Sequence, residues 1–361
     1  MIMSEKSKQH VESCRFCWMC HHICPIGTAT GHERSTPRAR ALGISLVNRG
    51  AIELEEIMDN IYECALCGGC VRDCITGWNP VMFTKEVRLQ AALDGKLPEY
   101  INTLVENCLE CGNAYGKTEL CPTLAEAIKA HSASTDTLLY LGADARYMAC
   151  TEAKKAIAVL EGAGVDFTVL LDEPASGAQL DFLIGAAEET REQMKAAAAM
   201  MNGYKTVVFY DPTDAKTAKQ TFGEYGIELE CSALTFTSFL AQLVRNGALK
   251  AQKSDRTVVY QDPYELSRDL EETEEARGVI SAYANLDEML LNRAATVWAG
   301  NILMAQYMPK VIKLVAERRI FNAKSVGKTA IVTASVSEYT ALKSVEQNDV
   351  EILSIEDLIL S

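Results

Sequence analysis

Apolar positions follow two different periods along the chain, and the change of period divides the chain into zones. Between residues 39 and 61, apolar side chains recur every three or four positions, as expected of helices that bury one face. From residue 137 onward, short apolar runs of strand length alternate with longer stretches of helical period. This alternation is typical of mainly parallel sheets whose strands are joined by right-handed helical crossovers.

The apolar runs of the second half are predicted to be buried strands, and the longer stretches between them to be helices. The predicted strands are residues 137–141, 167–171, 206–210, 227–230, 257–260, 295–298 and 330–333. The predicted helices include residues 152–161, 188–201 and 301–318.

The second half also contains an internal repeat. Thr206-Val-Val-Phe-Tyr-Asp is matched by Ala330-Ile-Val-Thr-Ala-Ser, and Thr137-Leu-Leu-Tyr is matched by Thr257-Val-Val-Tyr. The offset is about 120 residues each time, which is long enough for one domain per copy. The predicted fold is therefore mixed: a mainly α-helical domain over residues 1–100, a connector over 101–133, and two tandem α/β modules with parallel sheets over 134–252 and 253–361.

Charge and composition narrow the class of protein. The net charge of −14 disfavours binding to nucleic acid, because phosphates carry the same sign of charge. The apolar runs are shorter than a membrane span, and the polar first nine residues do not resemble a secretory signal, so we expect a cytoplasmic protein. Eleven of the thirteen cysteines lie between Cys14 and Cys121. In the reducing cytoplasm such a density favours metal binding over disulfides.

Two cysteine runs have the spacing of bacterial ferredoxins: Cys14-x-x-Cys17-x-x-Cys20-x-x-x-Cys24-Pro25 and Cys64-x-x-Cys67-x-x-Cys70-x-x-x-Cys74. In this pattern the fourth cysteine of each run binds the cluster of the other run. We therefore predict two [4Fe-4S] clusters. The first has the ligands Cys14, Cys17, Cys20 and Cys74, and the second has Cys64, Cys67, Cys70 and Cys24.

Two other interpretations fit these runs less well. Cys17-Trp18-Met19-Cys20-His21 fits the attachment pattern of c-type haem, but haem would leave Cys14 and Cys24 without a role. A zinc site uses four ligands, and eight cysteines in this register fit its usual paired spacing poorly.

A third constellation of cysteines follows in the connector. Cys108-x-x-Cys111 and Cys121-Pro122 supply three ligands, and Cys150 or Cys231 is expected to supply the fourth, with His131 as a further candidate. Similar signals occur in ferredoxin loops, which favours a third [4Fe-4S] cluster. The alternatives are reduced buried cysteines or a zinc site.

Three aspartates lie at the ends of predicted strands, namely Asp211, Asp214 and Asp262. Ligands often bind at the carboxyl ends of parallel strands, but an aspartate at such a position more often caps the following helix. No arrangement of Ser, His and Asp, or of Cys and His, indicates a catalytic nucleophile.

At these motifs the chain resembles a known family: the iron–sulfur subunits of heterodisulfide reductase, glycolate oxidase, lactate-utilisation and anaerobic glycerol-3-phosphate dehydrogenase complexes. The resemblance implies a helical dicluster ferredoxin domain followed by two tandem cysteine-rich domains. Beyond the cluster motifs it rests on Ser35-Thr-Pro37-Arg38-Ala-Arg40, Gly112-Asn113-Ala-Tyr115-Gly116, Gln261-Asp262-Pro263 and Asn292-Arg293.

The chain departs from this family in its C-terminal half, where the cysteine signatures are lost. The resemblance places those signatures at Ala143, Ala175-Ser176, Asp211 and Asp214 in the first module, and at Tyr264, Trp298-Ala299, Ser335 and Glu338 in the second. None of these side chains is a thiol, so none can be a thiolate ligand of a cluster.

The resemblance therefore implies an electron-transfer subunit of a multi-subunit oxidoreductase without a catalytic site of its own. Such a subunit relays electrons between a flavoprotein, expected to be an FAD-dependent dehydrogenase, and an acceptor. Ferredoxin or an electron-transfer flavoprotein is a further expected partner. One rival is a catalytic subunit whose repurposed C-terminal pocket is lined by Asp211, Asp214, Tyr264, Trp298 and Glu338. Another is a protein in which the clusters only stabilise the fold.

Overall fold

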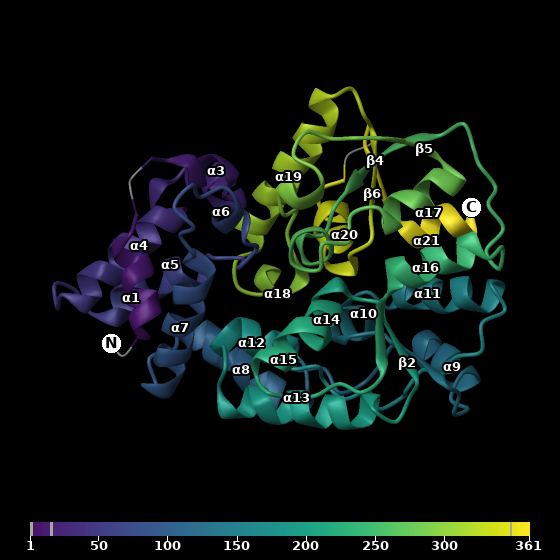
Figure 1. Cartoon of the computed structure of the whole chain (residues 1–361), viewed down its shortest axis with the longest axis horizontal. Helices are drawn as coiled ribbons and strands as arrows, with labels where there is room; N and C mark the ends of the chain where they lie inside the picture. The colour runs from purple at the N-terminus through teal and green to yellow at the C-terminus, as the bar shows by residue number, and fades with distance from the viewer. Residues whose placement is uncertain (1–2, 15–16, 347–348) are drawn as a thin grey trace.

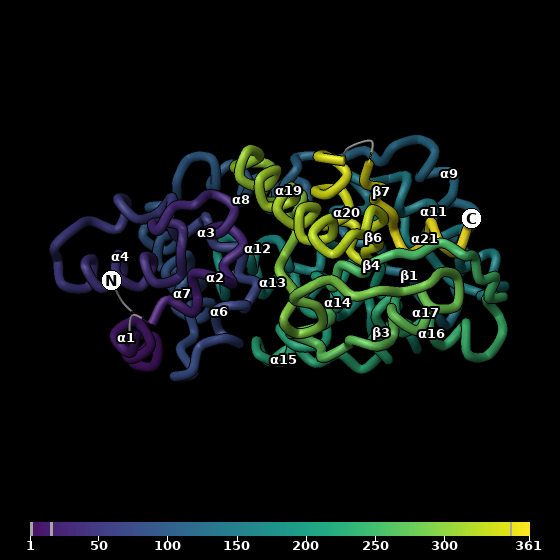
Figure 2. Tube along the Cα trace, turned by 90° about the horizontal axis from the view of Figure 1, so that it is seen from above, coloured from purple at the N-terminus to yellow at the C-terminus, as the bar shows by residue number. Residues whose placement is uncertain are grey.

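The structure is a computed structural model that describes residues 3–14, 17–346 and 349–361. Figure 1 shows a helical lobe at one end, formed by the N-terminal part of the chain, and two α/β lobes at the other. Seen from above, in Figure 2, helix α19 (Pro309–Ser325) of the last lobe lies beside the helical lobe.

The helical lobe consists of short helices around a core that includes Ile44, Ile61 and Phe83, all fully buried. Side-chain caps fix where the longer helices begin: Thr36 accepts a hydrogen bond from the N–H of Ala39, and Asn79 accepts one from Met82. The helices are α1 (Glu5–Glu12), α2 (Met19–Ile23), α3 (Pro25–Thr30), α4 (Pro37–Asn48), α5 (Met58–Tyr62), α6 (Gly69–Arg72) and α7 (Pro80–Leu93), with 3-10 turns at Glu33–Ser35 and Leu54–Ile57. Helices α8 (Glu99–Cys111) and α9 (Pro122–Ala130) follow in the connector.

The first α/β lobe is built on three parallel strands in the order β1-β2-β3. They are β1 (Thr137–Tyr140), β2 (Thr206–Phe209) and β3 (Ser232–Thr235), with Thr137 opposite Thr206 and Thr206 opposite Ser232. The helices of this lobe are α10 (Ala143–Met148), α11 (Cys150–Gly162), α12 (Ala178–Ile184), α13 (Glu188–Met201), α14 (Pro212–Lys216), α15 (Phe222–Glu224) and α16 (Phe236–Arg245), and a π-helical turn spans Thr217–Thr221.

The second α/β lobe has four parallel strands in the order β5-β4-β6-β7. They are β4 (Thr257–Gln261), β5 (Asn285–Asp287), β6 (Ala330–Thr333) and β7 (Glu351–Ser354). Its helices are α17 (Glu275–Tyr283), α18 (Ile302–Ala305), α19, α20 (Val336–Lys343) and α21 (Ile355–Leu360), with a π-helical turn at Glu265–Asp269 and a 3-10 turn at Arg293–Ala295.

The two sheets correspond strand by strand, in line with the sequence repeat. β1, β2 and β3 occupy the places that β4, β6 and β7 occupy in the second sheet. The counterpart of β5 is reduced to one bridge, in which Thr168 pairs with Leu138.

The structure confirms strands at four of the seven predicted runs and corrects the other three. Residues 227–230 form no strand, because Ile227 and Leu229 pack against the core beside β2 while the strand itself begins at Ser232. Residues 295–298 also form no strand, and the edge strand of that sheet is β5.

The backbone of two corrected runs is bound by arginine side chains instead of a neighbouring strand. Arg146 donates to the carbonyl oxygens of Leu170 and Leu171 at 2.9 and 2.6 Å, which leaves only one bridge in residues 167–171. Arg268 donates to the carbonyl oxygens of Ala294 and Thr296 at 3.0 and 2.5 Å. These guanidinium groups satisfy backbone acceptors that a sheet would otherwise pair.

Helices α11 and α13 confirm two of the predicted helices, and the third is interrupted. The stretch 301–318 is divided into α18 and α19, because Met308 has a φ of −136° and Pro309 begins the second helix. No helix in the described ranges is long and apolar enough to cross a bilayer.

Shared cores hold the three lobes together. One cluster joins both sheets through residues such as Leu160 of α11, Leu240 of α16 and Ile280 of α17. Tyr62 connects the helical lobe to both α/β lobes: its hydroxyl donates to the carbonyl oxygen of Leu183 at 2.7 Å, and its own carbonyl accepts from Tyr307 at 2.9 Å.

Candidate functional site

The two cysteine loops of the helical lobe have matching backbones. Trp18 and Gly68 occupy the same place in the two loops and have left-handed φ values of 68° and 70°. Each is followed at once by a short helix, α2 or α6, which carries the third cysteine of its run, Cys20 or Cys70. Glycine adopts this conformation readily, whereas tryptophan adopts it at a cost.

Cys14, Cys17, Cys20 and Cys74 line one cavity, together with Trp18, Arg38 and Trp78 among others. This cavity is near the surface, since Cys17 is exposed and the other three cysteines are half-buried. The guanidinium of Arg38 lies 4.2 Å from the centre of the Trp18 ring. Burial raises the pKa of Cys20 to about 11, so its free thiol is neutral at physiological pH.

Cys24, Cys64, Cys67 and Cys70 line a second cavity, which lies deeper than the first. The backbone N–H groups of Gly27 and Leu66 point to the sulfurs of Cys24 and Cys64, both at 3.4 Å. Burial raises the pKa of Cys67 to about 12 and that of Cys70 well above its usual value.

Arg40 also lines the second cavity and is 1 % exposed. Its guanidinium donates to the carbonyl oxygens of Asn60 and Ser35, both at 2.9 Å. Its positive charge lowers the pKa of Cys24, although burial of that thiol outweighs the effect. Arg40 therefore provides the second cavity with a positive charge that favours thiolate over thiol.

Two short helices connect the cavities. Helix α2 carries Cys20, which lines the first cavity, and is followed by Cys24, which lines the second. Helix α6 carries Cys70 of the second cavity, and Cys74 of the first follows it. Four residues of helix rise by about 6 Å, so the two cavities are close neighbours.

The donor set of each cavity fits an iron–sulfur cluster better than a single metal ion. Each contains four sulfurs, and the described residues include no group of three or more His, Cys, Asp or Glu side chains that could hold one ion. In a cubane each thiolate binds a different iron, so its four ligands do not converge on one point.

The five cysteines predicted for the third cluster do not all lie together in the described structure, although Cys108 and Cys111 are both on α8. Cys108 belongs to the core of the helical lobe, Cys121 and Cys150 pack at the edge of the core that joins the sheets, and Cys231 packs beside β2. Cys121 and Cys150 are hydrogen-bonded neighbours. The third cluster stays a prediction, and this arrangement favours Cys150 over Cys231 as the partner of Cys121.

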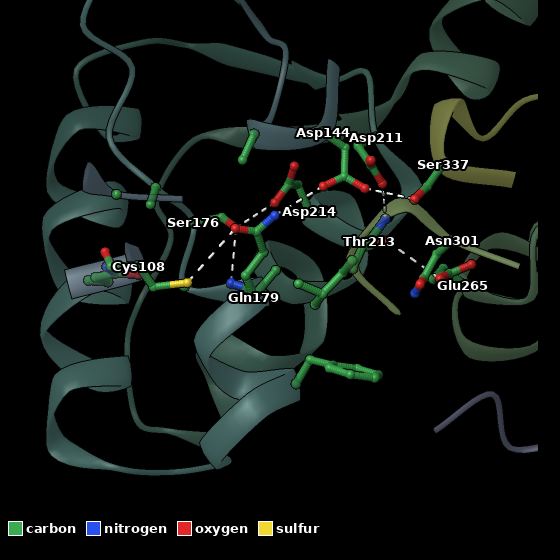
Figure 3. Close-up of a pocket in the computed structure, with 18 of the residues that line it drawn as sticks. Cys108, Asp144, Ser176, Gln179, Asp211, Thr213, Asp214, Glu265, Asn301 and Ser337 are labelled. Carbon is green, nitrogen blue, oxygen red and sulfur yellow. Dashed lines mark hydrogen bonds between the residues drawn. The ribbon is translucent and has the colours of Figure 1, made fainter. Parts of the chain in front are cut away.

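A cavity with about 60 Å³ of internal space lies between residues that follow strands of both sheets, and Figure 3 shows many of the side chains that line it. This space is enough for several water molecules or one small organic group. Its acidic residues follow strands of both lobes: Asp144 follows β1, Asp211 and Asp214 follow β2, and Glu265 follows β4. Cys108 of α8 and Gln179 of α12 also line it.

Hydrogen bonds tie the cavity wall together across the two lobes. Ser337, which follows β6, donates to Asp144 at 2.7 Å, and Gln179 donates to the other oxygen of Asp144 at 3.0 Å. Ser176 donates to Asp214. Burial raises the pKa values of Asp214 and Glu265 to about 7.

The lost cysteine signature of the first lobe lines this cavity. Ala143, Ala175, Ser176, Asp211 and Asp214 all belong to its wall. Asp211 is also the cap of α14, because its carboxylate accepts a hydrogen bond from the N–H of Thr213 at 2.8 Å. The sequence did not single out Asp144, Gln179, Glu265 or Ser337, although three of them lie just after a strand, where ligands of parallel sheets bind.

The corresponding positions of the second lobe are mostly filled. Tyr264 reaches the cavity, but Trp298, Ala299, Ser335 and Glu338 do not line it. This corrects the expectation that Trp298 and Glu338 line a repurposed pocket.

A buried hydrogen-bond network occupies this filled end. Glu338 accepts from the N–H of Ala299 at 3.1 Å and from the amide of Gln261 at 3.0 Å. Arg319, 1 % exposed, donates to Gln261 and to the carbonyl oxygens of Leu290 and Leu291. Asp262 caps no helix here and instead pairs with the buried Arg277 at 2.6 Å.

The second cysteine cavity lies close to the cavity between the sheets. Tyr264 lines the latter and packs in one cluster with Cys24, Cys67 and Trp298. Arg268 reinforces this contact, since it donates to the carbonyl oxygen of Cys67. Tyr264 and Arg268 therefore connect the loop after β4, which lines the cavity between the sheets, to the second cysteine loop.

Comparisons with known proteins define the class of this chain. Residues 10–78 match the family of 4Fe-4S dicluster domains. The helical lobe is thus similar to an iron–sulfur domain that binds two 4Fe-4S clusters.

The comparisons also confirm the predicted family resemblance. The chain is 26 % identical over 364 residues to one subunit of the dihydromethanophenazine:CoB–CoM heterodisulfide reductase of Methanosarcina acetivorans, covering 90 % of this chain and 86 % of that protein. The same subunit of the Methanosarcina mazei reductase is 26 % identical over 301 residues, with 75 % and 72 % covered. The crystal structure of a hypothetical protein from Helicobacter pylori matches with a TM-score of 0.52 at 9 % identity, covering 99 % of this chain and 72 % of that one. This last match supports the fold alone.

Proposed function

We propose that this chain relays electrons through two [4Fe-4S] clusters within a multi-subunit oxidoreductase. Cys14, Cys17, Cys20 and Cys74 would bind one cluster, and Cys24, Cys64, Cys67 and Cys70 the other. The observation that carries the proposal is that these eight cysteines line two neighbouring cavities, four sulfurs to each, joined by α2 and α6. When bound, the clusters supply the one-electron chemistry.

The residues around the two cysteine cavities would give the two clusters different surroundings. The second cavity is shielded from water, receives N–H groups on Cys24 and Cys64, and contains the buried cation Arg40. Hydrogen bonds and positive charge stabilise the more negative, reduced state of a cluster, whereas burial opposes it. The first cavity opens toward solvent beside the exposed Cys17, so it is the natural point for exchange with another protein.

The partner on that side is proposed to be a flavoprotein, with an FAD-dependent dehydrogenase as the first candidate and ferredoxin or an electron-transfer flavoprotein as a further carrier. The relatives are subunits of a heterodisulfide reductase, which supports a place in a complex. Copurification of the native complex, followed by mass spectrometry and flavin analysis of its chains, tests this part.

The cluster content is tested by quantifying iron and sulfide in the anaerobically purified chain, with EPR spectra of the dithionite-reduced protein. About eight irons per chain are expected for two cubanes, and about twelve if the connector cysteines bind a third. Fewer than four irons together with bound zinc would reject the proposal.

The crossed ligation is tested with Cys24→Ser, because Cys24 lies in the first run but lines the second cavity. We expect damage to the cluster bound by Cys64, Cys67 and Cys70. Cys231→Ser is the matched control and should leave both EPR signals unchanged. Selective loss of the other cluster in Cys24→Ser would contradict this ligand set.

A second candidate function is that of a catalytic subunit with a repurposed pocket. The cavity between the sheets favours it, because Tyr264 lines this cavity and packs in one cluster with Cys24 and Cys67 of the second cysteine set. Reduction or oxidation of a small substrate by the isolated chain would support this function and count against a role as carrier alone.

A further inference from the structure

Three arginine side chains bind the second cysteine loop, each from a different part of the chain. Arg40 belongs to α4, Arg88 to α7, and Arg268 to the π-helical turn that follows β4. All three donate to carbonyl oxygens of residues 60–67, the segment that leads into this loop and forms it. The tertiary structure therefore brings three cations from distant parts of the sequence to one short loop.

These cations lie close to the second set of sulfurs. Arg40 lines the second cavity together with its four cysteines. Arg88 donates to the carbonyl oxygen of Cys64 at 2.6 Å, and Arg268 donates to that of Cys67. Each guanidinium group is thus in contact with the cavity or with the backbone of a cysteine that lines it.

None of the three guanidinium groups is paired with a carboxylate of the described residues. Arg40 and Arg88 are 1 % and 0 % exposed, and Arg268 is half-buried. Their N–H groups donate to backbone carbonyl oxygens, which carry no net charge, and the Nε of Arg88 has no hydrogen-bond partner. Glu63 lies near Arg40, but its carboxylate pairs with Arg34 at 2.8 Å.

This arrangement calls for an anion nearby. A guanidinium group stays charged in proteins, and a buried charge is costly unless an opposite charge lies close to it. A cluster with four thiolate ligands is anionic, and its negative charge grows when it is reduced. The three cations therefore fit an iron–sulfur cluster in the second cavity, and they favour its reduced state.

The first cavity has different electrostatics. Arg38 is the one cationic side chain among the described residues that line it, and its guanidinium lies 3.8 Å from the carboxylate of Glu33. The exposed Cys17 brings solvent to this cavity, and water and salt weaken the field of a charge. Positive charge therefore acts more weakly on a cluster in the first cavity.

We propose that Arg40, Arg88 and Arg268 make the second cluster the more easily reduced of the two, so that electrons entering at the first cluster collect on the second. This inference rests on the proposed relay and adds a direction of flow to it. Burial by itself disfavours the more negative, reduced state. The same low dielectric strengthens the attraction of each nearby cation, and three cations without counter-anions outweigh the effect of burial.

An EPR-monitored redox titration of the anaerobically purified chain tests the order of the two potentials. Cys17→Ser assigns the signals, because an oxygen ligand at the exposed position of the first set should change the spectrum of the first cluster only. In the unchanged protein the second cluster should be reduced first. The expected equilibrium constant for transfer from the first cluster is at least ten, or about 59 mV for one electron. Equal potentials, or reduction of the first cluster before the second, would overturn the proposal.

Arg268→Gln tests the role of charge, because Arg268 is half-buried in a turn and its replacement leaves the two buried arginines in place. It should lower the potential of the second cluster by the equivalent of at least a tenfold change in this equilibrium and leave that of the first unchanged. Arg268→Lys retains the charge and should restore more than half of the shift. Arg72→Gln is the matched control: Arg72 lies on α6 beside Cys70 but is exposed and paired with Asp73, so neither potential should change.

Unchanged potentials in Arg268→Gln, or equal losses in Arg268→Gln and Arg268→Lys, would show that the arginine only holds the backbone and would reject the proposal. The order of potentials in the unchanged protein remains a test if a variant fails to fold. Iron content separates this inference from the relay on which it rests. About eight irons per chain with the opposite order of potentials would reject the inference alone, whereas a chain without iron would reject both.

Discussion

The two α/β lobes share a strand order but differ at the carboxyl ends of their sheets. In the first lobe, Ala143 and Ala175 leave a cavity. In the second, the corresponding positions hold Tyr264 and Trp298, and Trp298 is 1 % exposed. The difference in side-chain volume explains why one end is open and the other is filled.

The electrostatics of the two ends differ in the same way. Glu338 at the filled end accepts hydrogen bonds from Gln261 and Ala299 and lies near Arg319. Asp211 and Asp214 at the open end have no cation in the cavity wall, among the residues that the structure describes. Corresponding positions of the two lobes therefore have two different environments: a packed core in the second lobe and an unfilled acidic cavity in the first.

The largest expected effect is that of opening the filled end. Trp298→Ala should lower the free energy of unfolding by about 3–5 kcal/mol, because it removes a large buried ring and leaves a cavity. Phe321→Ala, at a ring that is 54 % exposed, is the control and should have a much smaller effect. Denaturant unfolding under anaerobic conditions measures both, and equal effects would show that the filled end is not packed as described.

Replacing Arg319 tests the buried hydrogen-bond network at the filled end. Arg319→Leu should cost about 3 kcal/mol, since Gln261, Leu290 and Leu291 lose their donor and Glu338 loses a nearby cation. Arg318→Leu changes the exposed neighbour on α19 and should alter the unfolding free energy by less than about 0.5 kcal/mol. An equally small loss for Arg319→Leu would show that the network contributes little to stability.

One glycine in each lobe, Gly177 and Gly300, is expected to be equally necessary for the stability of its lobe. Gly177 and Gly300 have φ values of 83° and 111°, which disfavour other residues. A Cβ would lie 2.6 Å from Met194 in the first lobe and 2.9 Å from Ala341 in the second.

Gly177→Ala and Gly300→Ala should therefore each cost about 1–3 kcal/mol. Gly223→Ala is the control, because nothing lies within 4 Å of a Cβ there and the residue is helical. Tolerance of alanine at only one of the first two positions would show that the lobes differ in backbone as well as in side chains.

A pH dependence of stability is also expected to originate at the open end. The folded-state pKa of Asp214 is about 7, above its usual value of 3.8, so the folded protein retains a proton that the unfolded chain has lost. Stability should therefore fall as pH rises from about 4 to 7 and level off above, by of order 1 kcal/mol per pH unit.

Asp214→Asn should make this dependence shallower between pH 5 and 8, as measured by denaturant unfolding, while Glu265, whose pKa is also about 7, retains part of it. Asp136→Asn, at an exposed residue paired with Lys205, is the control and should retain the slope. An unchanged slope in Asp214→Asn would place the titrating group elsewhere.

Local patterns were sufficient for much of the fold. Four strands were predicted at their places because their apolar runs are bounded by clear changes of polarity, and α13 was predicted with the bounds that the structure gives. Strands were predicted wrongly where the backbone of an apolar run binds side chains instead of a neighbouring strand. Residues 167–171 and 295–298 look like strands, but the carbonyl groups of Leu170 and Thr296 bind Arg146 and Arg268, which are distant in sequence.

The site was predictable only in part, for the same reason. The cysteine spacing singled out the eight sulfurs that line the two cavities of the helical lobe, whereas nothing near Asp144 indicated that Ser337 would donate to it. Which end of the repeat would remain open also depended on how Trp298 and Arg319 pack together with their neighbours.

The sequence alone determined the cofactor class, because cluster ligation follows from cysteine spacing over a few residues of backbone. Tertiary structure decided that the carboxyl ends of two sheets face each other and enclose acidic side chains beside the second cysteine set. That arrangement depends on contacts between residues more than a hundred positions apart, and no local pattern in a single sequence records such contacts.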